Sequence, residues 1–160
     1  MHAICDQEAR KFLEALFTGG KALADAHPGI FTSEKTFRPT AESNNARSSF
    51  VLRRCYSAGE ERFTLLSSGI SAPKSLHILH HLQKAITSTP KLTAIDDMGN
   101  PVDPAINPSH IAHLNATFPG GQTMCWTVMS GISISCANKG QFQSLCDTFT
   151  APARTASAAR

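Results

Sequence analysis

Residues 121–140 read GQTMCWTVMSGISISCANKG and contain the only Trp of the chain and two of its five Cys. Apolar and polar residues alternate on both sides of Met129–Gly131, which is typical of two strands joined by a three-residue loop whose glycine adopts the left-handed conformation. Because register follows the buried face, we expect one apolar face across the hairpin. The predicted pairs are Trp126–Ile134, Val128–Ile132 and Met124–Cys136.

The second face of this hairpin is polar. It carries Cys125, Thr127, Ser133 and Ser135. A two-residue loop would instead pair Trp126 with Ser135 and mix the two faces, so this alternative is disfavoured. The pattern therefore places one cysteine, Cys125, on the polar side of the predicted hairpin.

Length and composition indicate one globular domain. The chain has 160 residues, of which 41% are hydrophobic and 17% are charged, and its formal net charge is +3. We expect a single α+β domain over residues 1–150. Residues 32–49 lack periodicity and are predicted to be a mobile loop or an irregular edge strand. Residues 151–160 have little to bury, so a disordered tail is predicted there.

Periodicity along the chain defines the other elements. Helical spacing of apolar residues predicts helices over 6–18, 74–87, 108–115 and around Phe142–Phe149. A second hairpin is predicted from 49–56 and 61–67, with a two- or four-residue loop, and a short strand over 91–95. This order lacks the steady alternation of strand and helix that parallel sheets require. We therefore predict an antiparallel sheet, built from two hairpins plus a short strand and backed by three or four helices.

Several classes of protein are disfavoured. Arg47, Arg53, Arg54 and Arg62 are the nearest approach to a basic cluster, and a solvated strand face explains them better than a nucleic-acid patch. No apolar run approaches the ~18 residues of a membrane span. Nucleotide-binding and G-x-S-x-G motifs are absent, so no cofactor is predicted. Unpaired cysteines and an N-terminus without signal-peptide features predict a cytoplasmic protein, compatible with a signal-independent export route.

A cysteine-dependent hydrolase or transferase is the first catalytic alternative. Cys125 would be the nucleophile, with His110 or His113 as its base, because every His precedes Cys125 in the chain. This hypothesis requires a lowered thiol pKa and an open cleft beside the hairpin. The simpler interpretation is a small residue packed on the polar face of the sheet.

Metal binding is the second chemical alternative. His77 and His81 lie four residues apart on the predicted 74–87 helix, and this spacing lets two imidazoles meet one ion. They would occupy the helix face opposite Leu79 and Ile86, where surface histidines are common. Asp96, Asp97 and Asp103 offer oxygen ligands without the spacing of a calcium-binding loop, and are more simply turn formers.

No specific catalytic pattern stands out, so binding is the leading prediction. We expect a small protein that binds a macromolecular partner, most simply another protein, as an adaptor, inhibitor or secretion-associated factor. Its low charge leaves apolar and hydroxyl-bearing side chains on the surface. Short edge strands near residues 32–49 offer one way to receive a partner strand. The sequence carries no indication of oligomeric state.

Overall fold

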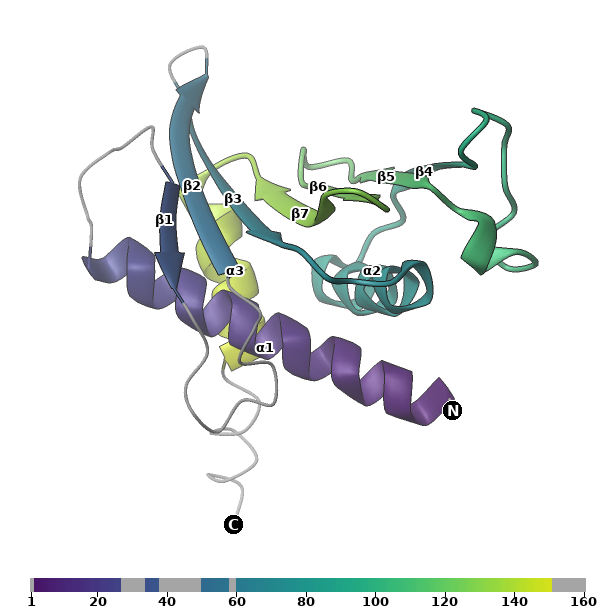
Figure 1. Ribbon diagram of the computed structural model, residues 1–160. Coiled ribbons are helices and arrows are strands. Elements are labelled where there is room, and N and C mark those ends of the chain that lie inside the picture. The colour runs from purple at the N-terminus through teal and green to yellow at the C-terminus, as the bar shows by residue number, and fades with distance from the viewer. Residues whose placement is uncertain (1, 27–33, 38–49, 58–59, 151–160) are drawn as a thin grey trace.

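A computed structural model describes residues 2–26, 34–37, 50–57 and 60–150, with side chains described for residues 6–26 and 62–150. Seven strands form one antiparallel sheet in the order β1-β2-β3-β7-β6-β5-β4 (Figure 1). The strands are β1 (Glu34–Phe37), β2 (Phe50–Ser57), β3 (Glu60–Ser67), β4 (Lys91–Ile95), β5 (His113–Thr117), β6 (Thr123–Thr127) and β7 (Gly131–Cys136).

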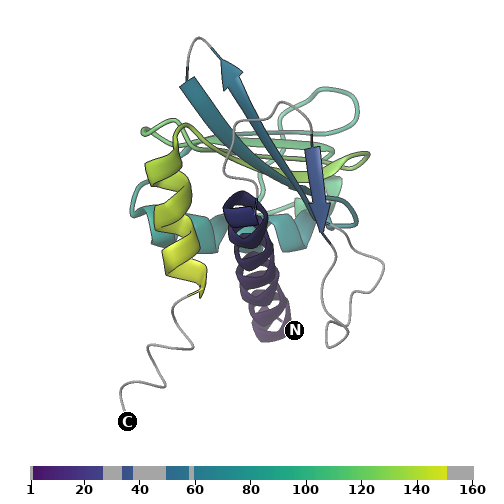
Figure 2. The same ribbon diagram turned by 90° about the vertical axis from the view of Figure 1, so that its left-hand side faces the viewer.

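Three α-helices cover one face of this sheet. They are α1 (His2–Ala26), α2 (Ala72–Ile86) and α3 (Lys139–Thr150), and a short 3-10 helix, η1 (Pro108–His110), precedes β5. Figures 1 and 2 show the helices below the sheet, with α1 and α3 side by side. The opposite face has no helix over it among the described residues. This is the predicted α+β class, with an antiparallel sheet backed by helices.

The core lies between the sheet and the helices. Phe63 of β3 stacks on Phe142 of α3, with ring centroids 4.6 Å apart and an interplanar angle of 10°. Phe17 of α1 stacks in turn on Phe149 of α3 at 5.4 Å. The buried apolar residues of the sheet, α1, α2 and α3 belong to a single cluster. Aromatic stacking thus ties the sheet to α3 and α3 to α1.

The Trp hairpin has the predicted faces but a different register. Met124, Trp126, Ile132 and Ile134 are buried on the helix side, and a three-residue loop joins β6 to β7. Trp126 pairs with Ile132, however, and Met124 pairs with Ile134, two positions from the predicted partners. The loop is therefore residues 128–130, and Val128 is exposed instead of buried.

A contact with β3 explains this register. Gly131 has a φ of 87° and pairs with Thr127 as the first residue of β7. A Cβ atom on Gly131 would collide with the Ser67 carbonyl oxygen at the end of β3. The left-handed glycine was predicted correctly, but β3 determines where it lies along the sheet.

The first helix is longer than predicted. It spans His2–Ala26 instead of residues 6–18 and continues through Gly19 and Gly20. Gly20 is buried, and a Cβ atom there would lie 2.8 Å from Leu65 Cδ2 of β3. This glycine therefore allows close packing of the helix on the sheet, which outweighs its low helix propensity.

The predicted 108–115 helix is wrong. Only Pro108–His110 forms a helical turn, and Asn107 makes no side-chain capping bond. Residues 113–117 form β5, in which Leu114 and Ala116 are buried, Asn115 is half-buried, and His113 and Thr117 are exposed. Pairing with β4 and β6 on both sides outweighs a short local helix signal.

The remaining elements agree with the sequence predictions. Helix α2 matches the predicted 74–87 helix, β4 matches residues 91–95, and α3 buries Phe142, Leu145, Cys146 and Phe149. In the second hairpin Ser57 pairs with Glu60, the register that a two- or four-residue loop produces. Strand β1 lies within the predicted 32–49 loop, while residues 38–49 and 151–160 fall outside the described residues. No described helix has the length and apolar character needed to cross a membrane.

Candidate functional site

Cys125 lies on the sheet face that the helices leave open. Its Sγ donates a hydrogen bond to Asn115 Oδ1 of β5 at 3.4 Å. Burial raises the pKa of the Cys125 thiol, and a hydrogen bond with Ser133 partly offsets this effect. A raised pKa keeps the group as a neutral thiol at neutral pH, whereas a nucleophile needs the thiolate.

The two candidate bases occupy different positions. His113 of β5 pairs with Thr127 of β6, while Cys125 pairs with Asn115. His113 and Cys125 are therefore diagonal neighbours on the same face of the sheet. His110 belongs to η1, outside the sheet. Among the described residues, the hydrogen-bond partners of Cys125 are Asn115 and Ser133 and include no histidine. The His–Cys contact that would activate a nucleophile is thus not formed within the described part of the chain.

Hydroxyl groups occupy much of the same open face. Ser135 Oγ of β7 accepts hydrogen bonds from Arg62 Nη2 at 2.9 Å and from Thr64 Oγ1 at 3.0 Å. The Arg62 guanidinium is therefore bound to the sheet itself. The side chains of Arg47, Arg53 and Arg54, the other members of the considered basic group, lie outside those described.

His77 and His81 lie beside α1, and the expected surface position is wrong for His81, which is buried, while His77 is half-buried. Asp6 Oδ1 lies 3.0 Å from His81 Nε2 and 3.7 Å from His77 Nδ1. His81 Nε2 also lies 3.3 Å from the Asp6 carbonyl oxygen, and its side chain is only 9% exposed. The partners of Asp6 could not be identified from the sequence, because they depend on the packing of α1 on α2.

The described residues provide few arrangements of side chains that could bind a metal ion. Within residues 6–26 and 62–150, no group of three or more His, Cys, Asp or Glu side chains is arranged to hold a metal ion. Asp96 Oδ1 accepts the backbone N–H groups of Met98 and Asn100 at 2.9 and 2.8 Å. Asp103 Oδ1 similarly accepts from Ala105 at 2.9 Å. These two carboxylates stabilise turns, as the simpler interpretation expects.

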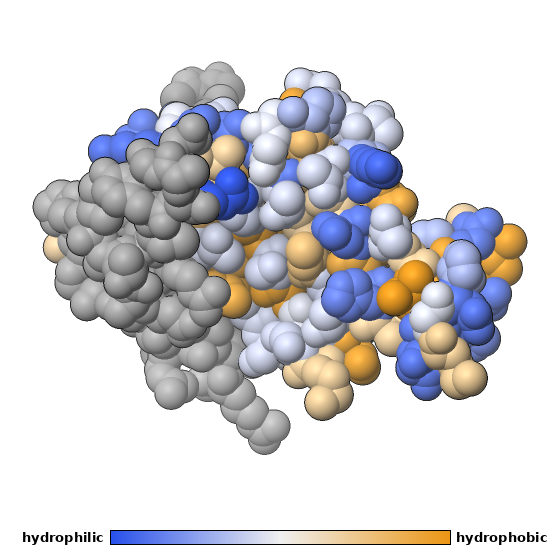
Figure 3. All heavy atoms as spheres, turned by 90° about the horizontal axis from the view of Figure 1, so that it is seen from above, coloured by the Kyte–Doolittle hydropathy of each residue, from blue (hydrophilic) through white to orange (hydrophobic). Residues whose placement is uncertain are grey.

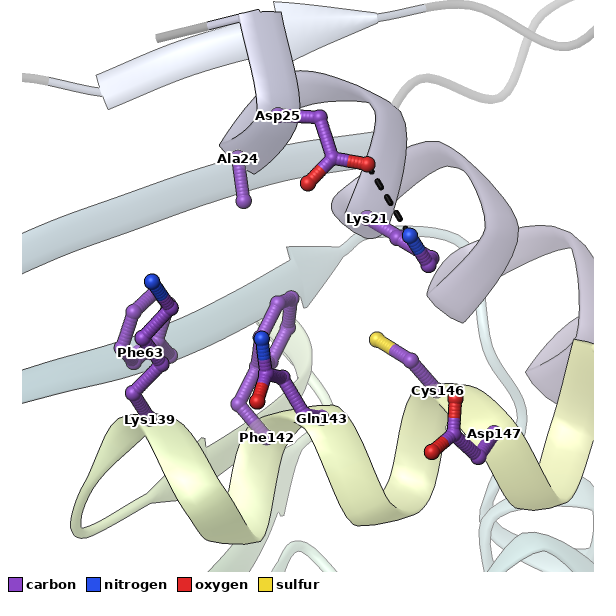
Figure 4. Close-up of a pocket in the computed structure, with 9 residues that line it drawn as sticks. All are labelled: Lys21, Ala24, Asp25, Phe63, Lys139, Phe142, Gln143, Cys146 and Asp147. Carbon is purple, nitrogen blue, oxygen red and sulfur yellow. Dashed lines mark hydrogen bonds and ion pairs between the residues drawn. The ribbon is translucent and has the colours of Figure 1, made fainter. Parts of the chain in front are cut away.

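A cavity of about 420 Å³ lies between α1 and α3 (Figure 4). Phe63 and Phe142 line its inner side, and both side chains are almost completely buried. Cys146 of α3 also lines it, and its Sγ lies 3.7 Å from the Phe17 carbonyl oxygen. Burial raises the pKa of the Cys146 thiol to about 12, so this wall is neutral.

Charged side chains surround the cavity opening. Lys21 Nζ and Asp25 Oδ2 of α1 form an ion pair at 3.0 Å, shown dashed in Figure 4. Lys139 lies at the start of α3 and Asp147 two turns further along it. The sequence singled out none of these charges, although the four-residue spacing of Lys21 and Asp25 is typical of a helix ion pair.

One end of the sheet gathers exposed apolar side chains. Ile95, His113, Thr127 and Gly131 form one row across four strands, so the 96–112 connection and the 128–130 turn leave the sheet at the same end. Val128 N donates to the Ala112 carbonyl at 3.1 Å and links the two segments. These segments carry four residues that are 65–90% exposed, here called the apolar end: Met98, Ile106, Val128 and Met129.

The space-filling view (Figure 3) shows that apolar side chains reach the surface of the molecule. In Figure 3 orange side chains lie among blue ones over the right-hand part of the molecule. Leu92 of β4 is the one other large apolar residue that is exposed among the described residues. This grouping was not predictable while Val128 was expected in the core and residues 108–115 were expected to form a helix.

Comparisons with protein-family models, with curated proteins and with solved structures found no match for this chain. Its candidate sites are therefore defined by their own geometry.

Proposed function

We propose that this protein binds a protein partner through the apolar end. The observation that supports this is the gathering of four of the five exposed large apolar side chains, among the described residues, on two neighbouring connections. Exposure of each such side chain to water costs about 25 cal/mol per Å² of apolar surface, and this cost is removed when a partner covers the surface. Grouped exposure of this kind marks interaction sites.

The charge around the apolar end indicates what kind of partner fits. Residues 92–138 contain Asp96, Asp97 and Asp103 and no Lys or Arg. Asp97 adjoins Met98, and Asp103 begins the turn that carries Ile106. A partner with apolar residues flanked by Lys or Arg would match both properties, because complementary charge accelerates encounter and disfavours wrong partners.

The role that follows is that of an adaptor, inhibitor or secretion-associated factor. Each acts through an exposed protein-binding surface and needs no catalytic group. Cys125, Cys136 and Cys146 are free thiols, which is typical of proteins in a reducing compartment such as the cytoplasm. The hydrolase alternative has weaker support, because Cys125 contacts Asn115 instead of His113.

The test compares partner capture by two variants after crosslinking in cells. Val128→Ser with Met129→Ser removes two side chains of the apolar end from a surface turn, where the fold tolerates change. Leu92→Thr is the matched control, since Leu92 is exposed but lies on β4, away from the apolar end. Quantitative mass spectrometry should show a partner that is lost with the double variant and retained with Leu92→Thr. Equal capture by both variants would refute the proposal.

A further inference from the structure

We infer that the cavity between α1 and α3 binds a small carboxylate with an aromatic or branched apolar body. This inference is independent of the apolar end. The volume of about 420 Å³ lies within the range of small-molecule sites, roughly 300–1,000 Å³. Within the described part of the chain, residues of α1, α3 and β3 line the cavity (Figure 4).

The apolar body of the ligand would lie on a preformed floor. Phe63 and Phe142 are stacked almost parallel, and Phe142 also contacts the Phe17 ring at 6.3 Å. Because packing on several sides holds these rings, little ordering is needed when a ligand arrives. Ala24 and the Cys146 thiol add small, weakly polar surface on opposite walls. An apolar group of moderate size is therefore favoured here.

The anionic group would lie at the Lys139 end. Lys21 already has its counter-charge in Asp25, at 3.0 Å. Lys139, in contrast, forms no hydrogen bond or ion pair with any residue that the structure describes, and Figure 4 shows it beside Phe63. As the first residue of α3, it also lies where the helix dipole is positive.

The acidic side of the cavity is separate from Lys139. Asp147 follows Lys139 by eight residues, about 12 Å along a helix at ~1.5 Å per residue. The Phe63 and Phe142 end therefore carries the Lys139 charge, whereas Asp147 at the other end lies close enough to Lys21 to help raise the pKa of that lysine. A ligand with one carboxylate and an uncharged body fits this polarity if its carboxylate meets Lys139 and its body extends over the rings.

The experiment uses 1-anilinonaphthalene-8-sulfonate, an aromatic anion, as a fluorescent probe on the full chain, with phenylacetate as the displacing carboxylate. We expect saturable binding at one site, displacement by phenylacetate and none by the cation phenethylamine. Lys139→Glu should weaken binding roughly tenfold or more, because a charge-assisted contact is lost. Its matched control is Lys84→Glu, an exposed lysine in the last turn of α2.

A second pair of variants tests the cavity itself. Ala24→Phe fills it from α1 and should abolish binding, whereas Ala22→Phe adds the same ring at an exposed position two residues away. The inference is wrong if both lysine variants behave alike, if phenethylamine displaces the probe as well as phenylacetate does, or if binding depends on Val128 and Met129. Cavity variants that alter partner capture but not probe binding would also overturn it, by assigning the cavity to a protein side chain.

Discussion

Trp126 connects the hairpin to a segment far away in the chain. Its Nε1 donates to the Ile70 carbonyl at 2.7 Å, between β3 and α2, and the residue is only 3% exposed. Trp126→Ala should lower the free energy of unfolding by about 3–5 kcal/mol, the usual cost of truncating a buried aromatic residue. Urea denaturation followed by circular dichroism measures this change.

The hydrogen bond of Trp126 can be separated from its packing. Trp126→Phe keeps an aromatic ring but leaves the Ile70 carbonyl without its donor, which costs about 1–3 kcal/mol. The loss should therefore be smaller than for alanine but measurable. A phenylalanine variant as stable as the wild type would show that the Ile70 contact contributes nothing.

The buried Cys136 thiol should make the folded state less stable at alkaline pH. Burial raises the pKa of its thiol from 9.0 to about 12, and Arg62 lowers it by a smaller amount. The folded state therefore disfavours the Cys136 thiolate relative to the unfolded state. The free energy of unfolding consequently keeps its full value below pH 9 and decreases as pH rises from 9 towards 12. The loss approaches about 1.4 kcal/mol per pH unit in this window.

A cysteine variant isolates this contribution from other groups that titrate at high pH. Cys136→Ala should be less stable than the wild type near pH 8, because it leaves a small cavity. Its free energy of unfolding should then fall less steeply between about pH 9 and about pH 11. Parallel decline of the two proteins in urea denaturation would contradict the assigned pKa.

At the level of elements, Asp6 holds α1 against α2. Its carboxylate approaches His77 and the buried His81 on α2. Asp6→Ala should destabilise the protein by about 1–3 kcal/mol, because His81 loses a partner inside the interface. A double-mutant cycle with His81→Ala should give a coupling of roughly 0.5–3 kcal/mol. Additive effects of the two substitutions would show that the contact is not energetically significant.

The spacing of apolar residues predicted helices and strands correctly where the buried face of a single element determines its structure. The spacing of Leu79 and Leu82 identified α2, and the alternation around Trp126 identified both faces of its hairpin. Three errors arose where distant segments decide, and the first is the register of the Trp126 hairpin, which contact with β3 sets. Gly20 packs against Leu65, so α1 continues past residue 18, and residues 113–117 pair with two strands instead of forming a helix.

The candidate sites likewise divide into features that local sequence determines and features that depend on the packing of distant segments. Sequence spacing revealed the His77–His81 pair and placed Cys125 on the polar face, because both properties are local. The Asp6 contact depends on how α1 packs on α2, and the cavity depends on how α3 packs on α1 and β3. The apolar end needs the row of strand pairs that brings two connections together. Such arrangements have no signature in a short stretch of sequence.

For the whole molecule, one core implies one cooperative unit. Buried residues of the sheet, α1, α2 and α3 form a single cluster, and Phe63 and Phe17 both stack on α3. An element that separated would expose part of this shared surface, so partial unfolding is costly. We therefore expect unfolding in urea to occur in one transition, which is how a single domain over residues 1–150 should behave.

Two probes on different elements test this expectation. Trp126 fluorescence reports on β6, while circular dichroism near 222 nm reports chiefly on the three helices. If the core is shared, the two unfolding curves should have the same midpoint and slope. Loss of the Trp126 signal before the helical signal would show that β4–β7 unfold while the helices persist, and would divide the chain into two units. The Asp6→Ala variant makes the comparison stricter, because weakening the α1–α2 contact should shift both curves equally in a cooperative molecule.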